Sequence, residues 1–372
     1  MPIPRDVRTL MVALAAMVAL TLPLAAQDEP VDLGSGDVGE TESPLKVTGF
    51  GVLNYMYDGK TGENAFAGNK LAVGFLREIT DNAYIYGQLT TAVSVDEASG
   101  EVTTETEIDN LILSFTPTGF PDLNISGGRL DLPVGFERDD EPLLFHATPS
   151  FNFEMARPAK MTGLVATWSA ARSVQLSGLV FNGWDSELDP NKGKTGGIRA
   201  EFLPSEKVDI GLNALYGNEG DQGATNQRLL LNLDYAFQPS WDWIVAGEAN
   251  YGKDFDIAGV GDQKWKGGLV TVVHLFDRHW GVAARAEVLD DPDGARTGMP
   301  QTLESYTLTP LYSVGVGREG IFANVPHTRF RIPRLQVRAE VRLNHSSELF
   351  FPTDTGLSRW GVQLALQAVT TF

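Results

Sequence analysis

The sequence predicts an all-β fold: a closed, antiparallel transmembrane β-barrel of about sixteen strands, with roughly 14 to 18 allowed. The first observation is strict alternation of apolar and polar residues in residues 335–344, which a strand turns to opposite faces. The second is that this pattern recurs along the chain. The third is an export-like segment at the N-terminus, together with an aromatic residue, Phe372, at the C-terminus.

Residues 1–26 have the organisation of a cleaved signal peptide. Arg5 and Arg8 form a basic start, residues 10–24 are apolar, and Ala25-Ala26 supplies small residues for cleavage. Removing this segment changes the net charge from −19 to −20. Residues 27–45 are acidic and rich in Gly, Ser and Pro, so we expect a flexible periplasmic lead-in before a barrel over residues 46–372.

The overall composition excludes several classes of protein. The chain has no cysteine, so disulfides and thiol catalysis are excluded. Its net charge of −19 argues against a nucleic-acid partner, which requires a basic surface. After the first segment no run reaches the roughly 18 apolar residues that a spanning helix needs.

Sixteen segments have the length and alternation of membrane-crossing strands, which need about 9–11 residues when tilted. We predict them at 46–57, 68–78, 83–95, 104–117, 122–131, 160–170, 173–183, 195–203, 207–217, 226–238, 241–252, 264–276, 279–290, 302–316, 334–345 and 358–372.

Three strands illustrate the apolar face that we expect to meet lipid. The residues that share this face are Leu229, Leu231, Leu233, Tyr235 and Phe237 in the first, Trp265, Leu269, Thr271, Val273 and Leu275 in the second, and Trp243, Val245, Ala249 and Tyr251 in the third. Aromatic residues near the ends of such faces are typical of the girdles at a membrane interface.

The connections alternate in length, as expected for short periplasmic turns and long external loops. The short connections are 79–82, 118–121, 171–172, 204–206, 239–240 and 277–278. The long ones are 58–67, 96–103, 132–159, 184–194, 218–225, 253–263, 291–301 and 346–357. Residues 317–333 break the rule, and we interpret them either as an insertion or as a region that hides a further pair of strands.

Several segments resemble the putative β-barrel porin-2 family of bacterial outer-membrane proteins. They are residues 285–298, 307–310, 338–342, the last strand ending in Phe372 and, in the middle of the chain, 127–137. The resemblance implies a porin-like barrel in the outer membrane of a Gram-negative cell. It also implies that Phe372 is the signal read by the barrel-assembly machinery.

Residues 132–159 form the longest connection, and we predict that they fold into the lumen as a constriction loop. Irregular backbone at membrane depth is tolerated only where it lines water or packs against protein. Four phenylalanines could anchor the loop to the wall. Its charged candidate site residues are Glu137, Arg138, Asp139, Asp140, Glu141, Glu154 and Arg157.

The polar faces of the predicted strands supply candidate residues for the lumen wall. These are Arg199, Glu201, Asp234, Glu248, Arg285, Glu287, Arg338, Glu340 and Arg342. Such charges can stiffen the wall through ion pairs, or they can set the field that a hydrated solute meets. The acidic loop favours a weak preference for cations.

Other functions remain open at this stage. His345 with Ser347 suggests an outer-membrane phospholipase, although no orienting third group is evident. Residues 290–294 share only part of an EF-hand loop, and the histidines lack metal-ligand spacing, so no metal site is expected. A non-conducting receptor or structural barrel and a secreted β-sandwich are further alternatives.

We therefore expect a passive, water-filled outer-membrane pore for small hydrophilic solutes, with no catalytic residue and no cofactor. Its expected partners are outer-membrane lipid, lipopolysaccharide, the barrel-assembly machinery and these solutes. A homotrimer and a monomer both remain open, and no nucleic-acid partner is expected.

Overall fold

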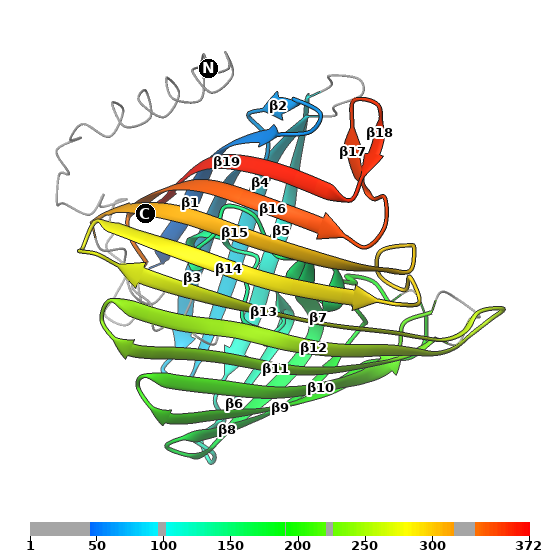
Figure 1. Ribbon diagram of the computed structural model, residues 1–372. Helices are drawn as coiled ribbons and strands as arrows, with labels where there is room; N and C mark the ends of the chain where they lie inside the picture. Colours follow the sequence, from blue (N-terminus) through cyan, green and yellow to red (C-terminus); the bar gives the residue numbers. More distant parts are fainter. Residues whose placement is uncertain (1–44, 96–101, 190, 221–225, 316–331) are drawn as a thin grey trace. The chain divides into compact units, whose positions relative to one another are not determined.

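The computed structural model describes residues 45–95, 102–189, 191–220, 226–315 and 332–372. Within this part of the chain, sixteen long strands form one closed antiparallel barrel (Figure 1). The strands of the wall are β1 (Lys46–Asp58), β3 (Asn69–Thr80), β4 (Ala83–Val95), β5 (Val102–Phe115), β6 (Leu123–Asp131), β7 (Lys160–Ala171), β8 (Val174–Phe181), β9 (Thr195–Ser205), β10 (Val208–Asn218), β11 (Gln227–Ser240), β12 (Trp243–Ile257), β13 (Gly261–Leu275), β14 (Trp280–Asp291), β15 (Gln301–Val314), β16 (Leu335–Ser346) and β19 (Trp360–Thr371). Each coincides with a segment predicted from the sequence to within a few residues, so the predicted fold class is confirmed.

The barrel closes where the first strand meets the last. β1 pairs antiparallel with β19 from Phe50↔Thr371 to Asp58↔Gln363. Beyond this ladder, Gly49 and Phe372 exchange two backbone hydrogen bonds of 3.0 and 3.1 Å. Closure satisfies the backbone groups that an open sheet edge would expose to lipid, where each unpaired group costs several kcal/mol.

β15 and β16, which flank the long connection, are direct neighbours in the wall. β15 pairs directly with β16 from Leu303↔Ser346 to Val314↔Leu335, which leaves no place in the wall between them. Residues 316–331 of this connection lie outside the described part of the chain, as do the expected signal peptide and acidic lead-in.

Three very short strands lie on the side of the long connections. β2 (Asn64–Ala65) pairs with β1, while β17 (Phe351–Thr353) and β18 (Gly356–Ser358) form a small hairpin in the connection after β16. The expected long loop at 253–263 is instead mostly strand. β12 and β13 continue their pairing through Asp254↔Gln263, so the connection shrinks to 258–260 and a hairpin projects from the rim (Figure 1).

At the opposite end the connections are tight turns. In the turn between β13 and β14, the Asp277 carboxylate accepts hydrogen bonds from the backbone N–H groups of Trp280 (2.8 Å) and His279 (2.6 Å). These bonds favour the ionised form and lower the pKa of Asp277. The side chain thus satisfies backbone donors that the turn would leave without partners.

Apolar side chains cover the outward face of the barrel. In β11, Leu231, Leu233 and Phe237 are exposed, whereas Asn232 and Asp234 are buried inside. Among the described residues, no helix is both long and apolar enough to cross a membrane.

One predicted face is reversed. Trp265, Leu269 and Val273 of β13 point into the barrel, where they are almost fully buried. Their partners across the ladder with β12 include Glu248, opposite Leu269, which also faces inward. The prediction was wrong because it assumed that the inner face meets water, whereas part of it packs against a connection folded inside the barrel.

Candidate functional site

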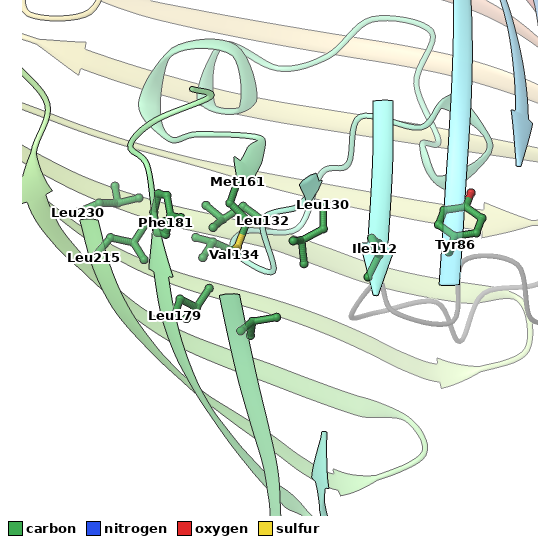
Figure 2. Packing of buried hydrophobic residues seen from close by; sticks show 11 residues of the cluster. Tyr86, Ile112, Leu130, Leu132, Val134, Met161, Leu179, Phe181, Leu215 and Leu230 are labelled. Atoms are coloured by element: carbon green, nitrogen blue, oxygen red, sulfur yellow. The ribbon is translucent and has the colours of Figure 1, made fainter. Parts of the chain in front are cut away.

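The connection 132–159 turns back into the barrel directly after β6. Leu132 and Val134 are buried in an apolar cluster with inward-facing side chains of the wall, which are Tyr86, Ile112, Leu130, Met161, Val165, Leu179, Phe181, Leu215 and Leu230. Figure 2 shows most of these side chains converging from separate strands on the start of the loop. Burying this apolar surface, at roughly 25 cal/mol per Å², holds the loop against the wall.

Gly135 lets the loop pass close to the wall at its first bend. Its φ is +79°, and an added Cβ would lie 2.1 Å from Nε of Arg157. The backbone N–H of Phe136 then donates a hydrogen bond to the Glu248 carboxylate, which also accepts one from Nε of Arg157 at 2.9 Å. Glycine is required here both for the positive φ and for the close approach.

The middle of the loop is held by Arg285 of β14. Its guanidinium donates to Oε1 of Glu137 at 2.6 Å and to the carbonyl of Thr148 at 2.9 Å. Its Nε also lies 3.8 Å from the Glu287 carboxylate. All three ionic side chains are buried, so the Arg285 guanidinium compensates the desolvation of the two carboxylates.

Two further arginines of the wall, both on β16, bind carbonyl groups of the loop. Arg338 donates to the carbonyls of Glu141 (2.8 Å), Leu144 and His146 (3.2 Å). Arg342 donates to the carbonyl of Pro149 at 2.7 Å and lies 4.5 Å above the ring of Phe151. A guanidinium has five N–H donors, so one arginine can satisfy several buried carbonyls.

Glu340 lies between these arginines along β16 and accepts hydrogen bonds from the loop and from β15. Its carboxylate accepts from the backbone N–H of Ala147 at 2.7 Å and from the hydroxyl groups of Thr148 and Thr309. The loop therefore presents carbonyl groups to Arg338 and Arg342 and a backbone N–H group to Glu340, which lies between them.

The end of the loop is a short helical segment of π type, Asn152–Ala156. The Asn152 side chain donates to the carbonyls of Gly268 (3.2 Å) and Val288 (3.1 Å). The indole of Trp265 donates to the carbonyl of Ala156 at 2.9 Å, which explains why this tryptophan faces inward.

The other charged wall residues named from the sequence form ion pairs with each other and do not line a solute path. Arg199 donates to Asp234 at 2.8 Å and to Glu201 at 2.9 Å, and Asp234 in turn accepts from the N–H of Gly135. All nine predicted wall residues face inward and are less than a tenth exposed. The loop covers them, so they lie dry against protein instead of lining an open lumen.

The charged residues of the loop are not equivalent in their access to water. The side chain of Asp139 is 35% exposed, whereas Glu137, Arg138 and Asp140 are at most 5% exposed as residues. Glu154 is also exposed, and Arg157 is buried against the ring of Phe153. Water therefore reaches the loop at two separate charged residues, Asp139 and Glu154.

The residues around Asp139 come from strands whose charges the sequence did not single out. Lys160 of β7 lies 3.2 Å from Asp139 and also pairs with Asp109 and Asp131. Lys70 of β3 lies 2.9 Å from Glu141.

A second, partly exposed ion pair lies on the neighbouring strands, and we call these charged residues around Asp139 the water-exposed sector. Arg129 of β6 lies 3.9 Å from Glu107 of β5. The only sequence signal for the sector was that Lys70 falls on the inward register of its strand. The remaining contacts depend on how strands pair across the barrel.

The phospholipase-like residues do not form a catalytic arrangement. His345 faces outward, 3.3 Å from Glu304 and beside the ring of Trp360. The Ser347 hydroxyl accepts a hydrogen bond from the N–H of Thr302. Within the described residues no hydrogen bond joins His345 to Ser347, so a nucleophile activated by a base is not assembled.

Residues 290–294, which share part of an EF-hand loop, stabilise the connection after β14 through hydrogen bonds. Asp291 accepts hydrogen bonds from the backbone N–H groups of Ala295, Arg296 and Thr297. Among the described residues, no group of three or more His, Asp and Glu side chains could hold a metal ion.

A sequence model of the family described as "Putative beta-barrel porin-2, OmpL-like" matches residues 72–372. The chain belongs to this family. The match covers four fifths of the chain and includes the wall from β3 onward together with the inward loop. The chain is therefore an outer-membrane porin-like barrel. A search of curated proteins found no significant match.

Solved structures share the fold at low sequence identity. The outer-membrane channel DcaP of Acinetobacter baumannii aligns with a TM-score of 0.59 and 10% identity, covering 90% of this chain and 100% of that one. The anion-selective porin of Comamonas acidovorans gives 0.58 and 10%, covering 88% and 99%. A trimer form of OmpT from Vibrio cholerae gives 0.56 and 11%, also covering 88% and 99%. At such identities these likenesses establish the architecture alone.

Proposed function

We propose that this porin-2 family member is a passive diffusion channel for small hydrophilic solutes or ions, narrowed by the loop 132–159. The observation that carries the proposal is the contrast within the loop between Asp139, whose side chain is 35% exposed, and its buried neighbours Glu137, Arg138 and Asp140. The loop is held to β14 and β16 by the contacts of Arg285, Arg338 and Glu340, and its start packs against β4–β8, β10 and β11. In this proposal the solute passes Asp139 and the charged residues beside it on β3, β5, β6 and β7.

The charges on this path favour cations. Glu187, Glu107 and Asp139 are the most exposed of the paired charged side chains there, at 65%, 61% and 35%, whereas Lys70 and Arg129 are 20% and 17% exposed. Acidic groups that project further into water attract cations more strongly than the recessed bases repel them. Three such barrels would assemble as a homotrimer, as one related fold does.

Planar-bilayer recording of the purified protein tests the channel directly. We expect steady ohmic conductance and a reversal potential in a KCl gradient that indicates preference for K⁺. A silent barrel under all applied voltages would instead support a non-conducting receptor or structural protein. That second candidate is favoured by one observation, the complete burial of the nine wall charges beneath the loop.

Asp139 determines much of the ion preference in this proposal. Asp139→Asn should lower the K⁺/Cl⁻ permeability ratio, by at most about fivefold, since one charge at 4 Å in water contributes about 1 kcal/mol. Asp139→Lys should lower it further. The measurement is the reversal potential in a salt gradient.

The control for this experiment is Glu206→Gln, which removes the same charge from the exposed turn between β9 and β10. Equal shifts in Asp139→Asn and Glu206→Gln would show that net charge, and not the exposed loop carboxylate, sets the preference.

A further inference from the structure

The Lys160 side chain lies within the water-exposed sector and contacts three carboxylates at once. Its Nζ lies 2.5 Å from Asp131, 2.8 Å from Asp109 and 3.2 Å from Asp139. An ammonium group has three N–H donors, so one is available for each carboxylate. The Lys160 side chain is only 8% exposed, so these contacts form largely away from water. The ammonium group is therefore held in one place and does not move freely in the lumen.

The three carboxylates come from three separate segments, and the fold positions each of them. Asp131 is directly opposite Lys160 in the ladder between β6 and β7. Asp109 is the extra residue of a β-bulge in β5, and both it and the next residue, Asn110, are buried. A bulge interrupts the alternation of a strand and redirects a side chain, which here brings Asp109 to Lys160. Asp139 comes from the inward loop.

Further contacts hold the Asp109 carboxylate in this position. The Gln88 side chain donates hydrogen bonds to Asp109 at 2.9 Å and to Asp140 of the loop at 3.0 Å. The Tyr86 hydroxyl donates to the side-chain carbonyl of Gln88 at 2.5 Å, which fixes the orientation of that amide. Asp109 is therefore kept near its present position by contacts that do not involve the lysine.

One positive charge stands against three negative charges at this point of the barrel. Among the described residues, no base other than Lys160 forms an ion pair with Asp109, Asp131 or Asp139. The nearby base Lys70 pairs with a different carboxylate of the loop. Carboxylates this close together repel one another, and the repulsion grows where water is scarce. Without the ammonium group, the three carboxylates would attract a cation from solution.

We propose that Lys160 is a specificity-determining residue of the channel, because its ammonium group occupies the position at which a dissolved divalent cation would otherwise bind. Ca²⁺ takes roughly six to eight oxygen ligands, and carboxylates supply them singly or in pairs. With the lysine in place, monovalent cations pass the exposed side of Asp139 and divalent cations are not retained. The consequence for solutes rests on the proposed channel function, whereas cation binding can be measured without conduction.

The test compares the full-length wild type with Lys160→Met in two measurements. In bilayer recording, Ca²⁺ at roughly millimolar concentration, the affinity of weak extracellular calcium sites, should block the variant and leave wild-type conductance unchanged. In detergent solution, the same Ca²⁺ should raise the thermal unfolding temperature of the variant alone, since a ligand stabilises the state that binds it. Lys160→Gln, which keeps a hydrogen-bond donor, replaces the methionine variant if that variant does not fold.

Three further variants serve as controls. Lys160→Arg keeps the positive charge and should show neither effect of Ca²⁺. Lys160→Met/Asp109→Asn removes one of the three carboxylates and should lose most of the response. Lys194→Met removes a lysine that pairs with Asp189 in the connection between β8 and β9, and it should create no dependence on Ca²⁺.

The two measurements separate failure of this assignment from failure of the proposed function. The assignment is overturned if Ca²⁺ neither blocks nor stabilises the Lys160 variant, or if it stabilises the wild type or Lys194→Met equally. Ca²⁺ stabilisation of the Lys160 variant in a barrel that never conducts would support the cation position and refute the channel.

Discussion

Replacing Arg285 with methionine is expected to release the loop 132–159 and to increase single-channel conductance. The substitution leaves the Glu137 and Glu287 carboxylates buried without their main counter-ion and removes the hydrogen bond to the carbonyl of Thr148. Breaking a buried ion pair by removing one partner costs about 3–5 kcal/mol. The barrel wall should remain folded because its backbone ladder does not involve this side chain.

The measurement combines bilayer recording with limited proteolysis of the loop. Arg278→Met, in the exposed turn between β13 and β14, is the matched control and should change neither quantity. Glu137→Met in addition to Arg285→Met should recover part of the stability, because one uncompensated charge is then removed. If the Arg285→Met variant had wild-type conductance and a loop equally resistant to proteolysis, the proposal that Arg285 holds the loop in place would be contradicted.

This experiment also separates the two candidate functions. A channel should conduct in the wild type and conduct more in the variant. A barrel closed by its loop should be silent in the wild type and conduct only after the contacts of Arg285 are removed.

Replacing Val341 with arginine is expected to destabilise the barrel strongly in lipid. Val341 is exposed on the outer face of β16, midway between the aromatic residues at its two ends, and its cross-strand neighbours are Leu308 and Leu364. A charged side chain on the lipid face near mid-membrane costs about 2–4 kcal/mol. The free energy of unfolding, measured by guanidinium titration in phospholipid vesicles, should fall by this amount.

His345→Arg provides the depth control for this prediction. It lies four residues further along the same outward face, next to Trp360 at the interface. An arginine there should cost about 0–1 kcal/mol. Equal destabilisation by the two substitutions would show that depth in the membrane does not govern the outer face of the wall.

The fold was predictable because lipid imposes a simple rule on the outer surface. Residues 335–344 alternate without error, and the observed β16 covers Leu335–Ser346. The tight turns were likewise visible as gaps of a few residues. Such signals are local, so they can be read from one strand at a time.

The inner surface was harder to predict because its environment depends on another part of the chain. Trp265 looked like a lipid-facing aromatic, but it donates its indole N–H to the loop at Ala156. Arg338 and Glu340 lie on the inward face, and the alternation along their strand contains no signal that they bind the backbone of residues 141–148.

The water-exposed sector could not be found from the sequence for a related reason. Lys160 begins β7 and meets Asp109 and Asp131 from two other strands as well as Asp139 from the loop. These contacts connect residues up to 51 positions apart and arise only once the strands are in register. Single-strand patterns contain no information about such neighbours.

The distant partners of the inward loop also set an order for folding. Ala147 accepts a hydrogen bond from Gln367 of the last strand, 220 residues away, and Arg338 reaches residues almost 200 positions earlier. Contacts between such distant residues form only after the intervening chain has been organised. We therefore expect the contacts that fasten the second half of the loop to form only when the final strands are in place.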